Sequence, residues 1–151
     1  MKIYHSFSSD ETKKFGVELV KKLLRDKRHV NKKQALVLAL KGDLGAGKTT
    51  FAQGFLRGLG VKKRASSPTF VLVKGYKLKV KGYSRVYHID VYRLGKPKEI
   101  LDLGLREILN NPKNIVLIEW AEKLKRYLPK DIVWVKFNHK KRAEEREISV
   151  I

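Results

Sequence analysis

The stretch of residues 42–49 constrains the fold of this chain more than any other part of its sequence. It reads GDLGAGKT and matches the pattern G-x-x-x-x-G-K-[ST] at every fixed position. The unbroken apolar run 35–40 precedes it, as expected of a strand that is covered on both faces. Residues 49–59 follow and are typical of a helix, which Gly60 ends. The pattern therefore predicts a strand, a phosphate-binding loop (P-loop) and a helix in succession.

Each fixed residue type in this loop has a physical role. The glycines let backbone N–H groups turn inward and form a concave anion site. The start of the following helix adds free N–H groups and the positive end of the helix dipole. Lys48 is expected to reach the β- and γ-phosphates as a mobile charge, and the Thr49 hydroxyl is a hard oxygen ligand for Mg²⁺. We therefore expect ATP and Mg²⁺ as cofactors.

A P-loop needs acidic residues to hold Mg²⁺ and to orient the attacking water. Glu119 follows four apolar residues, which is the usual form of a Walker B strand, and Asp90 ends the candidate strand 84–90. An acid at the end of an isolated strand is more often a surface residue. Beside a P-loop, however, both acids would point to the carboxyl edge of the sheet, where ligands bind in open α/β folds. Trp120, directly after Glu119, could form an aromatic wall of the site, although a core tryptophan is the more common interpretation. His88 could be a general base, but a buried, hydrogen-bonded histidine is favoured.

The segment Ser67-Pro68-Thr69-Phe70 lies between the P-loop helix and the next predicted strand. Many NTPases keep a switch segment at this place, so Thr69 could sense the γ-phosphate. It could equally be an ordinary strand entry in which Pro68 fixes the turn. Both interpretations stay open.

The remaining pattern predicts one α/β domain over residues 1–151. The spacing Ser8-x-x-Glu11 predicts a helix start, with Phe15, Leu19 and Leu23 on one apolar face. Further predicted helices cover 98–109 and 121–127. Further predicted strands cover 69–73, 76–80, 84–90 and 115–118, and 132–137 with 147–151 would form a terminal hairpin. We expect a three-layer P-loop NTPase fold with a mixed, mainly parallel central sheet and a C-terminal hairpin.

Composition limits the other possibilities. No cysteine is present, which excludes a disulfide framework and a thiolate metal site. No apolar run approaches the roughly 18 residues of a membrane helix, and no signal peptide is visible, so we expect a cytoplasmic protein without membrane contact. The chain has 35 Lys and Arg against 15 Asp and Glu, a net charge of +20. This excess fits either a thermophile's lysine-rich surface or a nearby polyanion, which could be nucleic acid or an acidic partner that handles nucleotides.

The segments GDLGAGKTT (42–50), SPTF (67–70), YHIDVYRL (87–94), DLGL (102–105) and IEW (118–120), in this order and spacing, resemble the TsaE family, also called YjeE. The resemblance covers nearly the whole chain. It implies a bacterial ATPase that is needed to make threonylcarbamoyladenosine at position 37 of tRNA. In that family TsaE does not transfer the threonylcarbamoyl group itself but works with the TsaB–TsaD pair, which does.

The resemblance also implies roles for individual residues. Lys48, Asp90 and Glu119 would be catalytic, with Thr49, Glu119 and Asp90 on the magnesium side and Thr69 as the switch threonine. Nucleotide would be bound by Leu44, Gly45, Ala46, Gly47, Lys48, Thr49 and Thr50, with Ser9 near the base, although the match around Ser9 is loose. The charged segment 138–146 departs from the family's glycine-containing hairpin, which puts in doubt any transfer of base contacts to it.

Two other functions remain compatible with the loop: a small-molecule kinase, and a nucleotide-gated RNA-binding module that hardly hydrolyses ATP. A kinase needs an acceptor pocket and usually an arginine-bearing lid, for which 151 residues leave little room. Arg57, Arg64, Arg85 and Arg93 all have ordinary structural interpretations, so the sequence identifies no arginine finger. We therefore expect weak ATPase activity from the isolated protein.

Overall fold

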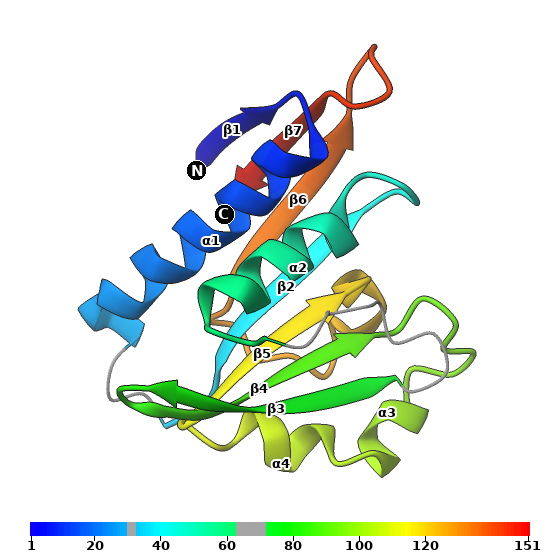
Figure 1. The fold of residues 1–151 in the computed structure, drawn as a ribbon. Coiled ribbons are helices and arrows are strands. Elements are labelled where there is room, and N and C mark those ends of the chain that lie inside the picture. Colours follow the sequence, from blue (N-terminus) through cyan, green and yellow to red (C-terminus); the bar gives the residue numbers. More distant parts are fainter. Residues whose placement is uncertain (30–32, 63–71) are drawn as a thin grey trace.

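The computed structural model describes residues 1–29, 33–62 and 72–151. Within these ranges the chain forms a seven-stranded sheet with helices on both of its faces (Figure 1). The strands are β1 (Lys2–Ser6), β2 (Leu36–Gly42), β3 (Val73–Val80), β4 (Tyr83–Asp90), β5 (Asn114–Glu119), β6 (Val133–His139) and β7 (Arg146–Val150). The α-helices are α1 (Ser9–Arg25), α2 (Lys48–Gly58), α3 (Glu99–Asp102) and α4 (Leu105–Leu109), and the 3₁₀ helices are η1 (Lys27–His29) and η2 (Ala121–Leu124).

The strand order is β1-β7-β6-β2-β5-β4-β3. In the centre, β2 pairs in parallel with both β5 and β6, and β4 pairs in parallel with β5. The outer pairs β3–β4, β6–β7 and β1–β7 are antiparallel. The mixed sheet, mostly parallel in its core, and the terminal hairpin are therefore as predicted. Every residue of β5 is buried, as expected of a central strand that is covered on both faces.

Alternate residues of β2 point to opposite faces of the sheet and enter two separate cores. Leu36, Leu38 and Leu40 pack with α1 and α2, whereas Val37 and Ala39 pack with α3, α4 and η2. The apolar run of β2 thus follows from its position between two layers of helices.

Helix α1 begins where the capping-box spacing predicts. The Ser8 hydroxyl accepts a hydrogen bond from the Glu11 N–H at 3.1 Å, and the Glu11 carboxylate accepts one from the Phe7 N–H at 2.7 Å. The helix then packs so closely on α2 that only glycine fits at position 54. A Cβ on Gly54 would lie 2.0 Å from the Lys13 carbonyl oxygen. This close approach brings the turn before α1 beside the start of α2.

Three sequence predictions need correction. The single helix predicted over 98–109 is two short helices, because Gly104 has a φ of 85° in the left-handed region and breaks it. The helix predicted over 121–127 is a 3₁₀ helix that ends at Leu124, with the i→i+3 bond from Lys123 N–H to the Trp120 carbonyl at 3.1 Å. Strand β1 was not predicted. Its residues have no clear strand pattern, and antiparallel pairing with β7, at the other end of the chain, makes them a strand.

Two further predictions concern the strand before β4 and the absence of a membrane helix. Residues 69–71 of the predicted strand 69–73 lie outside the described residues. The separation of that strand from the predicted strand 76–80 is wrong, because β3 runs without a break from Val73 to Val80 and pairs with β4 from Val73 onward. None of the helices within 1–29, 33–62 and 72–151 has the length and apolar character that crossing a bilayer requires.

Candidate functional site

The loop between β2 and α2 has the backbone conformation that its glycines allow. Gly45 and Gly47 have φ values of 73° and 100°, which lie in the left-handed region that residues with a Cβ rarely adopt. Gly47 is also the N-cap of α2, so the first N–H groups of this 11-residue helix point out of its end toward the loop. This arrangement suits an anion because N–H groups and the positive end of the helix dipole converge on one place.

Lys48 is buried at 4% exposure, although it is a charged residue. Its Nζ donates to the carbonyl oxygens of Gly42 at 2.5 Å and Asp43 at 2.7 Å, and it lies 3.9 Å from the centre of the Trp120 ring. Burial lowers the pKa of the Lys48 ammonium, and the carboxylates of Glu122, Glu119, Asp43 and Asp90 oppose that shift. The Lys48 ammonium is therefore held by two carbonyls of its own loop. To bind a phosphate, it would have to leave them.

Glu119, the last residue of β5, lies at the centre of a buried chain of hydrogen bonds. Its Oε1 accepts from the Thr49 hydroxyl at 2.6 Å, and its Oε2 is 2.6 Å from His88 Nε2. Glu119 and His88 are each 1% exposed. With the proton on Nε2, His88 donates to Glu119, so both carboxylate oxygens are held by hydrogen bonds. His88 Nδ1 is buried and has no hydrogen-bond partner among the described residues.

Asp90 and Glu119 lie side by side because they end adjacent parallel strands and are register partners. The Asp90 Oδ1 accepts a hydrogen bond from the Tyr92 N–H at 3.0 Å. The Tyr92 ring in turn lies 4.9 Å from that of Trp120. Trp120, interpreted from sequence as a core residue, is only partly buried; its left-handed φ of 60° turns the chain out of β5 and sets the ring beside Lys48.

These side chains enclose a hollow of about 260 Å³ at the carboxyl edge of the sheet. It is lined by Leu44, Gly45, Gly47, Lys48, Thr49, Thr50, Asp90, Tyr92, Glu119, Trp120 and Arg146. A smaller hollow of about 120 Å³ adjoins it at Gly47, Thr50 and Arg146 and is lined further by Ser8, Ser9, Thr12 and Glu144. The predicted nucleotide-binding residues, Ser9 included, therefore lie around two neighbouring hollows, except for Ala46, which is fully buried beneath the loop.

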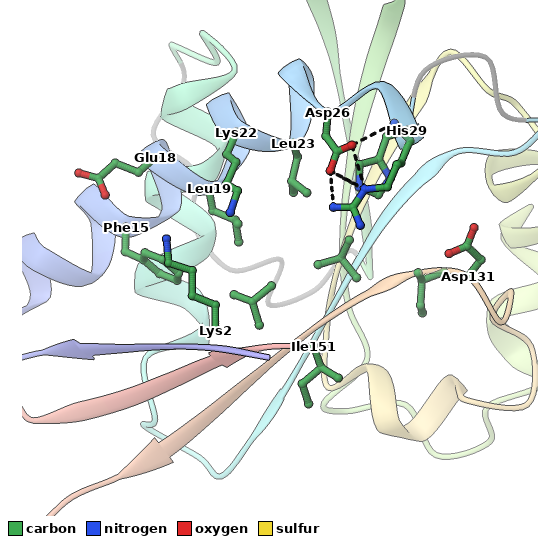
Figure 2. Close-up of a pocket in the computed structure, with 14 residues that line it drawn as sticks. Lys2, Phe15, Glu18, Leu19, Lys22, Leu23, Asp26, His29, Asp131 and Ile151 are labelled. Carbon is green, nitrogen blue, oxygen red and sulfur yellow. Dashed lines mark hydrogen bonds and ion pairs between the residues drawn. The ribbon is translucent and has the colours of Figure 1, made fainter.

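A further cavity, of about 650 Å³, lies elsewhere, between α1 and the β1–β7–β6 edge (Figure 2). Phe15, Leu19 and Leu23 form its apolar wall, and Lys2, Asp26 and Asp131 lie around it. It contains none of the predicted site residues.

The terminal hairpin contributes two residues that the sequence did not identify. Gly42 and Phe137 are register partners in β2 and β6, so the hairpin that follows β6 lies over the loop that follows β2. His139 Nε2 is 3.1 Å from the Leu44 carbonyl oxygen, and Arg146 Nη2 donates to the Gly45 carbonyl at 3.2 Å. Their separation from the loop by 95 and 101 residues leaves no local signal; only the β2–β6 pairing brings them there.

The donor set fits Mg²⁺, which prefers hard oxygen ligands and keeps several waters. The Thr49 hydroxyl and the Glu119 carboxylate are in direct contact, and Asp90 ends the neighbouring strand. No group of three or more His, Cys, Asp and Glu that could hold a metal occurs among the described residues. These residues thus fit an ion that is shared with phosphate oxygens and water, and not an all-protein metal cage.

The family model for the threonylcarbamoyl adenosine biosynthesis protein TsaE matches residues 6–148. The chain belongs to the TsaE family. It is 38% identical over 135 residues to the tRNA threonylcarbamoyladenosine biosynthesis protein TsaE of Haemophilus influenzae, covering 89% of this chain and 80% of the relative. It is 44% identical over 115 residues to the TsaE of Bacillus subtilis, covering 75% of this chain and 67% of the relative.

A solved structure agrees with this assignment. The crystal structure of Bacillus subtilis YdiB superposes with a TM-score of 0.71 at 32% identity, covering 99% of this chain and 83% of the other. The resemblance to the TsaE family that the sequence motifs indicated is therefore confirmed.

The TsaE motifs have different places in the fold. Residues of GDLGAGKTT, Asp90 and Tyr92 of YHIDVYRL, and the last two residues of IEW surround the larger hollow. DLGL lies at the junction of α3 and α4, where Gly104 supplies the left-handed residue between the two helices. SPTF, with the candidate switch residue Thr69, lies outside the described residues, so its role stays a prediction.

Proposed function

We propose that this TsaE-family chain binds ATP and Mg²⁺ in the larger hollow and hydrolyses the nucleotide as an accessory protein of tRNA threonylcarbamoyladenosine biosynthesis. The observation that carries the proposal is the convergence of Lys48, Thr49 and Glu119 at the start of α2. A buried lysine bonded to two carbonyls, and a hydroxyl bonded to a buried carboxylate, cost desolvation energy and add little apolar packing to a core. They suit a site where a polyphosphate and a cation replace those internal partners.

In this proposal each residue of the chain has a distinct role. The N–H groups of the loop and of the start of α2 hold phosphate oxygens, and Lys48 moves from the Gly42 and Asp43 carbonyls to the phosphates. Thr49, Glu119 and Asp90 face the magnesium side, and the carboxylates orient the attacking water. When bound, Mg²⁺ would neutralise charge on the phosphates and stabilise the charge of the transition state. His88 keeps the Glu119 carboxylate in place.

The proposed partners are a TsaB–TsaD-like protein pair, which would perform the transfer to tRNA in the cytoplasm, and tRNA itself. The β3–β4 hairpin offers a surface for a polyanion. Lys77, Lys79, Lys81 and Arg85 are exposed there, and Lys77 is the register partner of Arg85. Like charges that face each other across strands cost stability, so an unbalanced basic pair favours an anionic partner.

A binding and turnover experiment tests the proposal. Calorimetry with ATP and Mg²⁺ should show binding at micromolar to millimolar nucleotide, and phosphate release should follow ATP, with Mg²⁺ required for release. A pull-down from lysate of a TsaE-containing bacterium, with and without ATP, should recover a TsaB–TsaD-like pair. The absence of ATP binding at millimolar nucleotide would overturn the proposed function. Phosphate release that rises with a small hydroxylated acceptor would favour a kinase.

A further inference from the structure

The cavity of about 650 Å³ between α1 and the β1–β7–β6 edge lies where the close packing of the core ends (Figure 2). Val135 and Phe137 of β6 are buried, whereas Val133, on the same face of the same strand, is only partly buried. The same change occurs along β7, from the buried Ile148 to the partly buried Val150. Both partly buried side chains pack toward α1 and line the cavity. The sheet therefore presents an apolar floor that α1 does not fully cover.

The size and walls of this cavity suit a small organic molecule. Phe15, Leu19 and Leu23 of α1 line it opposite the apolar floor. Its volume lies within the roughly 300–1,000 Å³ of pockets that hold such ligands, which are mostly apolar with a few placed polar groups. Among the described residues it shares no lining residue with the two hollows at the carboxyl edge of the sheet. A molecule bound here would therefore be separate from a nucleotide bound there.

At the η1 end of the cavity the charges compensate each other. Arg28 Nε donates to both carboxylate oxygens of Asp26 at 3.0 Å, and Nη2 donates to Oδ2 at 2.6 Å. His29 Nε2 lies 3.9 Å from the same carboxylate. The hydrogen bond and the charge of Asp26 raise the pKa of Arg28, and the charge of Asp131 adds to them. This end therefore offers little net charge to a ligand.

The other charged residues of the cavity, Lys2 and Lys22, are arranged differently. Figure 2 shows the Lys22 side chain extending from α1 toward the sheet and the Lys2 side chain extending from β1 toward α1. Neither ammonium has a hydrogen bond or ion pair within the described residues. Glu18, the remaining acid of the lining, extends away from both in the same view. Two cations thus converge beside an apolar floor without an acid to bind them, which suits an anionic group.

We propose that this cavity binds a small organic anion with an apolar body, such as a medium-chain carboxylate. The apolar chain lies between Leu19 and Leu23 of α1 and Val150 of β7, and the carboxylate lies between the ammonium groups of Lys2 and Lys22. Burial of apolar surface supplies affinity, and the two ammonium groups select an anion over a neutral molecule. The inference does not depend on the proposed function, because the two sites have no lining residue in common.

The test measures the binding of octanoate, octanol and acetate by titration calorimetry at one salt concentration. Octanol has the apolar chain without the charge, and acetate has the charge without the chain. Acetate also measures the general attraction of anions to a net charge of +20. Wild type is compared with Lys2→Gln/Lys22→Gln. The matched control is Lys14→Gln/Lys21→Gln, which removes the same charge from exposed positions of α1 outside the cavity.

Octanoate should bind once per chain, and octanol and acetate should each bind about tenfold or more weakly. Lys2→Gln/Lys22→Gln should weaken octanoate binding by about tenfold or more, because it removes charge-assisted contacts. Lys14→Gln/Lys21→Gln should stay within about twofold of wild type.

A second pair of variants tests the apolar floor. Val150→Phe places a larger side chain in the cavity and should abolish octanoate binding. Ile3→Phe, at an exposed position of β1 outside the cavity, should bind octanoate as wild type does. Thermal unfolding shows whether each variant keeps its fold, and if Val150→Phe does not, the two lysine variants decide.

Three results would overturn the inference: no binding of octanoate to wild type, equal octanoate affinity in the two double-lysine variants, or wild-type affinity in a folded Val150→Phe. The last result would mean that octanoate binds elsewhere on the chain. Calorimetry of wild type with ATP and Mg²⁺ tests the proposed function separately, so the failure of one proposal leaves the other standing.

Discussion

Thr49 and Glu119 are 70 residues apart in the sequence, yet the Thr49 hydroxyl donates a 2.6 Å hydrogen bond to the Glu119 carboxylate. The sheet produces this contact. Strands β2 and β5 are parallel neighbours with Leu40 opposite Glu119, so the helix that follows β2 begins beside the acid that ends β5. Because both oxygens of Glu119 already have polar partners, its carboxylate has a fixed orientation before any ligand arrives.

Replacing Glu119 by Gln should separate nucleotide binding from hydrolysis. The amide keeps the volume and can still accept from Thr49, but it removes a negative charge from the magnesium side. We expect phosphate release to fall by about 10² or more while ATP affinity changes little. Single-turnover phosphate release and calorimetry measure the two quantities. Glu99→Gln is the matched control, because it removes an exposed carboxylate on α3 that lines neither hollow.

A drop in hydrolysis of no more than about threefold in Glu119→Gln would make Glu119 a structural residue and leave the role to Asp90. Asp90→Asn, measured in the same way, shows whether the two register partners share the task. Equal and large losses in both variants would indicate a joint role on the magnesium side.

Much of this site could be predicted from the sequence, because local patterns specify it. The loop glycines, Lys48 and Thr49 lie in one continuous motif, and Asp90 and Glu119 each end an apolar strand. Parallel pairing of buried strands then places both acids at one edge, as expected. Arg146 and His139 could not be predicted, since their place depends on the β2–β6 register and on a hairpin that crosses the loop. The left-handed Trp120 likewise depends on tertiary contacts, because its residue type does not favour that conformation.

Lys48→Ala should abolish ATP binding at millimolar nucleotide and keep the fold. The lysine supplies a charge-assisted contact to the β- and γ-phosphates, which is worth roughly 1.5–3 kcal/mol and more when the contact is partly desolvated, as the burial of Lys48 favours. Calorimetry with ATP and Mg²⁺ measures the loss, and circular dichroism checks the fold. Lys125→Ala, which removes an exposed lysine that does not line the hollow, should bind ATP as wild type does. Equal ATP affinity in wild type and Lys48→Ala would rule out the P-loop assignment.

His88→Phe should destabilise the protein and lower hydrolysis together, because it leaves Oε2 of the buried Glu119 without its donor. A buried acceptor without a partner costs about 1–3 kcal/mol in the free energy of unfolding. Urea denaturation and phosphate release at saturating ATP measure the two effects. His5→Phe, on the exposed face of β1, is the control.

A double-mutant cycle then asks whether the effect of His88 passes through Glu119. In the Glu119→Gln background, His88→Phe should cause a much smaller loss of hydrolysis than in wild type, because the carboxylate that His88 orients is already absent. Additive losses of activity would show that His88 acts independently of Glu119.

Any direct binding of tRNA to the isolated protein should be electrostatic and should use the β3–β4 hairpin. Because neutralised phosphates release counterions, affinity should fall steeply between about 50 and 200 mM salt, with little sequence preference. Replacing the exposed Lys77, Lys79 and Arg85 by Ala should reduce the slope of log affinity against log salt. The control replaces three exposed basic residues of α1, Lys14, Lys21 and Arg25, and so removes the same charge. Tight, salt-insensitive binding would indicate a base-reading surface instead.

The last prediction concerns the dependence of hydrolysis on partner proteins. The sequence identified no arginine finger, and the structure places the guanidinium of Arg146 against the carbonyl of Gly45 in the loop. In the state described, however, its donors are bonded to the carbonyls of Gly45, Glu145 and Ala143. Because its donors have these partners, we do not assign Arg146 to the charge of the transition state. A finger that is supplied in trans can be worth about 10³–10⁵ in rate.

We therefore expect slow phosphate release from the isolated protein and clear stimulation by a stoichiometric TsaB–TsaD-like pair. Steady-state phosphate release with and without the pair measures this, and Lys48→Ala with the pair shows whether the released phosphate comes from this site. Fast turnover by the protein alone, unchanged by the partners, would mean that one chain contains the complete site, and the accessory-protein proposal would then be wrong.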